Sequence, residues 1–137
     1  MKANTLLLRI PLAIILVMHS IPGMLDGGIK QFGTMFLNPL CFSPLGIYLA
    51  SLIKLSHVGA AIALILNKYL RPAAWGTIFV LFVGIITVHL ESGWFVVGGG
   101  SNGVEYNFLL IFVWLYLIFS GGRGQQKPTY RSFFTLW

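Results

Sequence analysis

Charged residues are scarce in this sequence: Asp, Glu, Lys and Arg make up 9% of its 137 residues, against 57% for the hydrophobic types. The mean hydropathy of +0.86 does not fit a water-soluble domain. One cysteine, Cys41, cannot form an internal bridge, which excludes a secreted disulfide scaffold. The composition also excludes a disordered tail protein and a Rossmann-type or barrel enzyme. Because so much of the sequence is hydrophobic, we expect the chain to lie in a lipid bilayer.

The net charge is +6, since nine lysines and arginines outnumber three acids. A nucleic-acid-binding surface needs a basic stripe with interleaved aromatic residues on a polar face, and the sequence has no such stripe. We therefore expect no nucleic-acid partner. An excess of positive charge is typical of the cytoplasmic loops of membrane proteins.

Four long apolar runs predict an all-α membrane protein, a single domain over residues 1–137 built as a four-transmembrane-helix bundle. A bilayer core is about 30 Å thick and a helix crosses it with about 20 residues. The expected spans are about 5–25, 45–66, 72–90 and 104–119, with an outer segment 26–44 and a cytoplasmic tail 120–137. Arg9 splits the first run and no small-x-small cleavage pattern follows it, so we interpret this run as a span rather than a signal peptide.

The lysines and arginines outside the spans predict the orientation of the bundle. Most of them fall on the side that holds both chain ends: Lys2, Arg9, Lys68, Arg71, Arg123, Lys127 and Arg131. The opposite side has Lys30 and all three acids, Asp26, Glu91 and Glu105. Because basic residues are retained in cytoplasmic loops, both termini are predicted to be cytoplasmic.

The two outer connections differ in character. Segment 26–44 carries Phe32, Phe36 and Phe42 among glycines and prolines, which predicts a re-entrant or amphipathic segment at the interface. The other connection places Trp94 where aromatic belts lie and then supplies glycines that permit tight turns.

Lys54 is the most informative charged residue, because it lies about nine residues into the second span, close to the midplane. His57 follows three residues later and so shares its helix face, which small residues flank. One interpretation is a proton-linked or ligand-binding pocket. The other is that Lys54 bonds backbone carbonyls and His57 simply packs in the core.

Further polar residues come from the other three spans. His19 lies deep in the first span and is a candidate neighbour of Lys54, whereas Arg9 is interpreted as a topology anchor that reaches the cytoplasmic boundary. In the third span, either the helix unwinds so that His89 and Glu91 both face inward, or only Glu91 does. Glu105 opens the fourth span, as a pocket group or as a helix cap, with Asn107 just inside. The predicted pocket in the outer half of the bilayer comprises His19, Lys54, His57, His89, Glu91 and Glu105, and no metal site is predicted.

The string from His89 to Phe112, followed by "SGGRG" at 120–124, resembles the second half of the DoxX family of small four-helix membrane proteins. Arg9, Gly23 and the Lys54–Leu55 pair occupy places that match its first half. The resemblance implies a bacterial inner-membrane protein, linked to quinone-dependent sulfur oxidation or to thiol and oxidative-stress systems with partner proteins. It carries over Arg9, Lys54, His89 and Glu105 as polar positions without settled catalytic roles.

Three functions remain open from the sequence. The first is a redox-linked membrane subunit whose outer pocket binds a quinone, with Lys54, His57 or His19 donating hydrogen bonds and Glu91 or Glu105 exchanging protons. It would act with a partner rather than as a stand-alone enzyme, and haem between two histidines ranks below quinone as its cofactor. The second is a structural or assembly subunit of a larger membrane or periplasmic complex. A small transporter ranks last, because such proteins use a carboxylate deep in a span, whereas the acids of this sequence lie at helix ends.

Overall fold

The computed structural model describes residues 5–121, and this part of the chain is helical with no strand. The expectation of an all-helical fold is therefore confirmed for these residues. The elements, in chain order, are α1 (Leu6–Leu25), α2 (Gly28–Phe32), the π-helical η1 (Gly33–Phe42), α3 (Gly46–Leu66), α4 (Leu70–Gly84), the π-helical η2 (Ile85–His89), the 3₁₀-helical η3 (Leu90–Ser92) and α5 (Glu105–Gly121).

Three helical segments are long and apolar enough to cross a membrane: Leu6–Leu25, Gly46–Leu66 and Leu70–Ser92. Their bounds lie within a few residues of the first three predicted spans, because predominantly apolar runs of this length have few other stable arrangements. The fourth predicted span corresponds to a shorter apolar helix, Glu105–Ser120. From residue 122 on, the predicted tail lies outside the described residues, as does Lys2.

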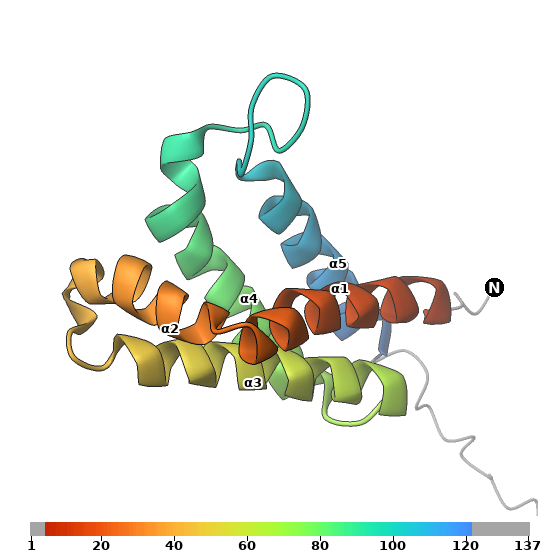
Figure 1. Cartoon of the computed structure of the whole chain (residues 1–137). Coiled ribbons are helices and arrows are strands. Elements are labelled where there is room, and N and C mark those ends of the chain that lie inside the picture. The colour runs from red at the N-terminus through yellow and green to blue at the C-terminus, as the bar shows by residue number, and fades with distance from the viewer. Residues whose placement is uncertain (1–4, 122–137) are drawn as a thin grey trace, which may run out of the picture.

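The helices form two units that meet at the α3–α4 turn (Figure 1). In the first, the α1–α3 pair, the two helices lie antiparallel, and α2 with η1 continues beyond α1 along the first half of α3. In the second, the α4–α5 hairpin, the helices rise away from the first unit and are joined by loop 93–104 (Figure 1). The start of α1, the α3–α4 turn and the end of α5 gather on one side of the molecule.

The hydrophobic core lies where the α4–α5 hairpin meets the α1–α3 pair. Buried residues on α1 recur at helical spacing, and small alanines on α3 let the two backbones approach closely. Trp114 of α5 is fully buried and is the largest side chain in this core. The buried cluster comprises Leu12, Ala13, Leu16, Ala60, Ala61, Leu64, Ala74, Leu81, Leu110, Trp114, Leu117 and Ile118.

The outer segment packs against α3 through a close backbone approach between two buried glycines, Gly33 and Gly46. A Cβ added at Gly33 would lie 2.6 Å from the Cα of Ile47, so only glycine fits here without a backbone shift. The N–H of Gly46 also donates to Oδ1 of Asn38 at 3.1 Å, which satisfies one free donor at the start of α3. The segment is thus fixed to α3, while its depth in the bilayer remains a prediction.

Loop 93–104 closes on itself through its own backbone. The N–H groups of Gly103, Val104 and Glu105 donate to the carbonyls of Phe95, Gly93 and Trp94 at 3.1, 3.1 and 3.0 Å. Gly103 is buried in this turn, where an added Cβ would lie 2.6 Å from the carbonyl carbon of Trp94. The loop is therefore an ordered cap on the outer end of the α4–α5 hairpin.

Candidate functional site

Three of the predicted pocket residues come together between α1 and α3. The rings of His19 and His57 meet edge to face, with centroids 5.6 Å apart and an angle of 64° between their planes. Nζ of Lys54 donates to the backbone carbonyl of His19 at 2.6 Å. We call His19, Lys54 and His57 the inner cluster.

Local sequence explains how Lys54 reaches α1. Pro22 lacks an N–H and cannot donate to the carbonyl four residues earlier, so the α1 ladder is weakened in this turn. The next carbonyl, that of His19, accepts the Lys54 ammonium. Gly23 leaves room for the lysine stem, since a Cβ there would lie 3.8 Å from Cε of Lys54. The carbonyl freed by Pro22 is that of Met18, so the feature that admits the lysine beside His19 is the missing side chain of Gly23.

His57 is the least satisfied member of the inner cluster. Its side chain is 2% exposed, and neither Nδ1 nor Nε2 has a hydrogen-bond partner within the described residues. Ser20 Oγ on α1 and Trp114 Nε1 on α5 are buried without a partner in the same sense. Each such group costs about 1–3 kcal/mol when buried unpaired, so a ligand that bonds to His57 would recover stabilisation the fold lacks.

Arg9 occupies the opposite end of the α1–α3 pair. Its Nε donates to the carbonyl of Leu64 at 2.7 Å, and Nη2 donates to the carbonyls of Leu64 and Ile65, the latter at 3.3 Å. Because α3 ends at Leu66, these carbonyls have no acceptor role in the helix ladder. We expected Arg9 to extend to water, but it is 6% exposed and caps α3 instead.

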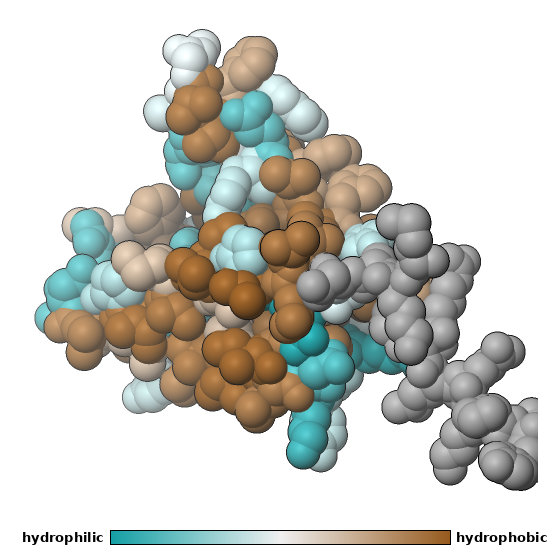
Figure 2. Space-filling view, turned by 90° about the vertical axis from the view of Figure 1, so that its right-hand side faces the viewer, coloured by the Kyte–Doolittle hydropathy of each residue, from teal (hydrophilic) through white to brown (hydrophobic). Residues whose placement is uncertain are grey.

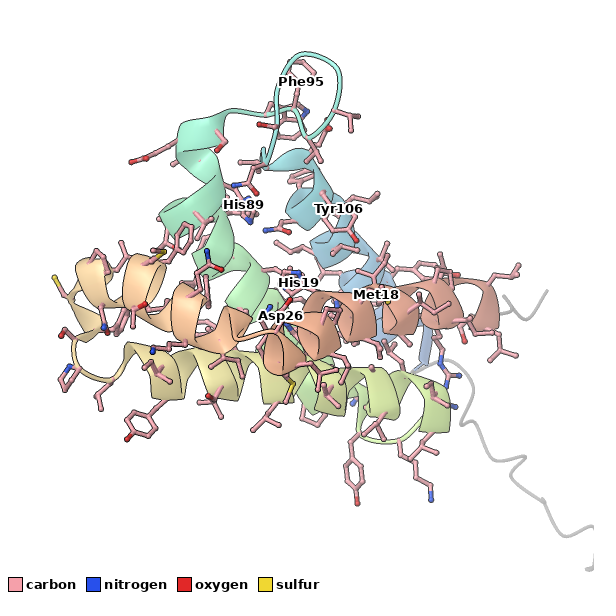
Figure 3. The ribbon with its side chains drawn as sticks, in the orientation of Figure 1. Met18, His19, Asp26, His89, Phe95 and Tyr106 are labelled. Carbon is pink, nitrogen blue, oxygen red and sulfur yellow. The ribbon has the colours of Figure 1, made fainter. Side chains whose placement is uncertain are left out.

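His89 and Glu105 serve loop 93–104. Nδ1 of His89 lies 2.7 Å from the carbonyl of Asn102, a geometry that assigns the ring proton to Nδ1. Oε1 of Glu105 accepts from the N–H of Val96 at 2.8 Å. Figure 3 shows His89 beside α5 near the outer end of the hairpin, whereas His19 lies on the α1–α3 pair. His89 and Glu105 thus form a second polar group, which bonds loop 93–104.

The remaining predicted residues do not join the inner cluster. The helix does depart from α geometry at η2, but it is His89 that turns toward the loop, while Glu91 is exposed on η3. Trp94 is 50% exposed in the outer loop. Asn107 is buried on α5, where its Nδ2 would lie 3.8 Å from a Cβ added at Gly84.

Two residues near the inner cluster were missed from the sequence. Asp26, at the end of α1, is the acid whose field reaches Lys54. It is exposed, and its Oδ1 accepts from the N–H of Gly28 at 3.0 Å. Ser20 could have been found from its spacing, because it continues the buried α1 series of Arg9, Ala13 and Leu16.

The site offers ring nitrogens and an ammonium rather than a metal-binding set. Among residues 5–121, no three His, Cys, Asp or Glu side chains gather as a metal site would require. Cys41 is exposed on the outer segment. The chemistry available to the inner cluster is therefore hydrogen bonding and proton exchange.

Apolar helices of membrane-spanning length, paired through small residues and interhelical bonds from two cations, define a multi-pass membrane protein. The DoxX family model matches residues 4–90, more than half of the chain, and the protein belongs to the DoxX family. The match includes Arg9, the inner cluster and His89, and it ends before the outer loop and α5. No curated protein and no solved structure matches the chain.

Proposed function

We propose that this protein is a redox-linked membrane subunit that binds the head group of a quinone at the inner cluster and acts with a partner protein. The observation that carries the proposal is His57, a buried imidazole whose two nitrogens both lack a hydrogen-bond partner in the part of the chain that the structure describes. Buried polar groups are normally hydrogen-bonded, and the exceptions concentrate at sites that bind or react.

The donors of the inner cluster suit a quinone. A lysine ammonium has three N–H donors, and the carbonyl of His19 accepts one of them. A neutral imidazole provides one donor and one acceptor. Lys54 and His57 can therefore donate to a carbonyl oxygen, and His57 can accept from a hydroxyl. A haem between His19 and His57 is not proposed, because their direct ring contact leaves no room for a porphyrin.

The chemistry supplied by a bound quinol is oxidation to the quinone, which releases two electrons and two protons. His57 would hold the proton of a quinol hydroxyl through the acceptor nitrogen of its neutral imidazole. Asp26, exposed and within electrostatic reach of Lys54, is placed to pass protons to water. The electrons go to the partner protein, since the side chains of the inner cluster carry no redox group.

We further propose that α5 is a fourth span and that the protein lies in the bacterial inner membrane with both termini cytoplasmic. Arg9, Lys68 and Arg71 fall on the side where α1 begins and α5 ends (Figure 1), whereas the three acids fall at the opposite ends of the helices. This distribution follows the retention of basic residues in cytoplasmic loops.

A structural or assembly subunit is the second candidate, and one observation favours it. Lys54 already bonds the carbonyl of His19 and Arg9 bonds those of Leu64 and Ile65, so the half-buried lysine and the buried arginine both join α1 to α3. In this case the polar groups stabilise helix pairing, and the surface serves a larger complex.

One experiment separates the two candidates. The full chain is purified in mild detergent, its quinone content is measured after solvent extraction, and co-purifying proteins are identified. Lys54→Met and His57→Phe are compared with Lys68→Met, the same type of change at an exposed lysine. If Lys54→Met and His57→Phe lose quinone and Lys68→Met keeps it, the result supports quinone binding at the inner cluster. If instead the chain co-purifies with a large partner but no quinone, and Lys54→Met leaves that assembly unchanged, quinone binding is contradicted and the structural subunit is favoured.

A further inference from the structure

An apolar groove runs along the outer surface of the α1–α3 pair, away from the inner cluster. It consists of two connected hollows of about 180 and 340 Å³ that share Ile10 and Ile65. Arg9 lines the smaller hollow, and Ala13 has the smallest side chain lining the larger one. No residue of the inner cluster lines either hollow. The complete lining is Leu6, Arg9, Ile10, Ala13, Ile14, Val17, Met18, Leu64 and Ile65.

Among residues 5–121, the charge of Arg9 has no carboxylate partner. Its bonds to Leu64 and Ile65 are to neutral carbonyls, which satisfy its donors without balancing its charge. The sequence has three acids, and all belong to the opposite ends of the helices: Asp26 after α1, Glu91 in η3 and Glu105 at the start of α5. A largely buried guanidinium near a membrane surface is strongly stabilised by an anion.

We propose that this groove binds one anionic phospholipid, with its phosphate beside Arg9 and one acyl chain along the groove from Ile10 to Met18. Arg9 is the fourth residue of α1, so it lies about one helical turn inside the end of the span, within reach of the headgroup region. The hollow beyond it is lined by aliphatic side chains and a methionine, which suit an acyl chain. None of the bonds from Arg9 to α3 uses Nη1, whose N–H groups suit a phosphate oxygen.

The surrounding surface supports an anionic rather than a neutral lipid. Lys68 and Arg71 are exposed at the α3–α4 turn, on the same side of the molecule as Arg9. Figure 2 views this end, where hydrophilic surface gathers at the turn next to apolar surface. Basic residues near a membrane attract anionic lipid by about 1 kcal/mol each. The groove thus combines an apolar channel with a positive end.

Lipid binding is tested with the full chain in detergent by native mass spectrometry. Dioleoyl phosphatidylglycerol and dioleoyl phosphatidylcholine are titrated separately, because they share acyl chains and differ in net charge. We expect at least fivefold tighter binding of the anionic lipid, and we expect Arg9→Gln to reduce this preference by roughly fivefold. Ile14→Trp fills the groove without touching Arg9, and we expect it to abolish binding of the tight lipid.

Ile62→Trp is the matched control, because Ile62 on α3 is 52% exposed, Ile14 is 57% exposed, and Ile62 does not line the groove. We expect this variant to bind lipid as the unmodified chain does. Equal binding of the two lipids, equal behaviour of Ile14→Trp and Ile62→Trp, or displacement of the lipid by inorganic phosphate would each overturn the proposal. The tryptophan pair decides the question even where Arg9→Gln fails to fold.

Discussion

The α1–α3 pair and the α4–α5 hairpin contrast in where they hold their polar groups. In α1 and α3, 28% and 33% of the most apolar 18-residue stretch is buried inside the protein, against 11% for Leu70–Ser92. The α1–α3 pair holds cations and a histidine between its helices. The hairpin holds its histidine and glutamate at the outer loop, where both have backbone partners. In the α1–α3 pair, polar contacts between the helices thus accompany tight packing. In the α4–α5 hairpin, polar side chains bond the loop, and more of the helix surface is exposed to lipid.

The largest effect is expected from removing the cap that Arg9 places on α3. Arg9→Met leaves the carbonyls of Leu64 and Ile65 without their charged donor, which costs about 3 kcal/mol of unfolding free energy. Arg71→Met, at an exposed position on the hairpin, is the control and is expected to change little. Thermal unfolding midpoints in detergent measure both, and an equal change in the two variants contradicts the capping role.

The next largest effect is expected from disturbing the close approach of the outer segment to α3. Gly33→Ala forces a Cβ against the backbone of Ile47 and is expected to destabilise the protein by about 2 kcal/mol. Gly76→Ala in α4 meets nothing within 4 Å, and the higher helix propensity of alanine stabilises that variant by up to about 1 kcal/mol. Chemical unfolding measures the change in unfolding free energy of each variant, and we expect the two changes to have opposite signs. Changes of the same sign would argue against the packing difference between the two units.

Buried His57 and half-buried His89 give a sharper comparison. His57→Phe removes two unpartnered nitrogens and keeps the ring, so we expect it to stabilise the protein by about 1 kcal/mol while quinone binding is lost. His89→Phe removes the bond to Asn102 and is expected to destabilise by about 1 kcal/mol. Unfolding curves of the two variants test this, and destabilisation by His57→Phe would mean that His57 has a structural partner.

The smallest effect is expected at the loop. Glu105→Gln replaces a charged acceptor for the Val96 N–H with a neutral one, which weakens the bond by about half. We expect a few-fold faster hydrogen exchange at Val96 without a change in the unfolding midpoint. Exchange at Ile53, in the middle of α3, is the internal reference and stays the same. Unchanged exchange at Val96 would show that the backbone pairs alone hold the loop.

Much of the fold could be predicted from the sequence, because apolar runs fix the helices almost independently of tertiary contacts. Lys54 and His57 were expected on one face because a spacing of three residues places them there. The bond partners could not be predicted. Arg9 bonds a helix end that lies more than fifty residues away, and His89 bonds a loop carbonyl whose position depends on the backbone pairs of Gly93 and Phe95. Such targets are main-chain atoms, which carry no residue-type signal.

The cap on α3 also constrains how the chain enters the membrane. Arg9 and Leu64 are separated by 55 positions, so the first helix is synthesised and inserted long before its acceptors exist. During that interval the guanidinium must remain at the lipid–water boundary, since moving it deeper without a partner is costly. Only when the end of α3 leaves the ribosome can the first helix settle into its final position. Completion of α3 is therefore the step that commits the first half of the protein to its native arrangement.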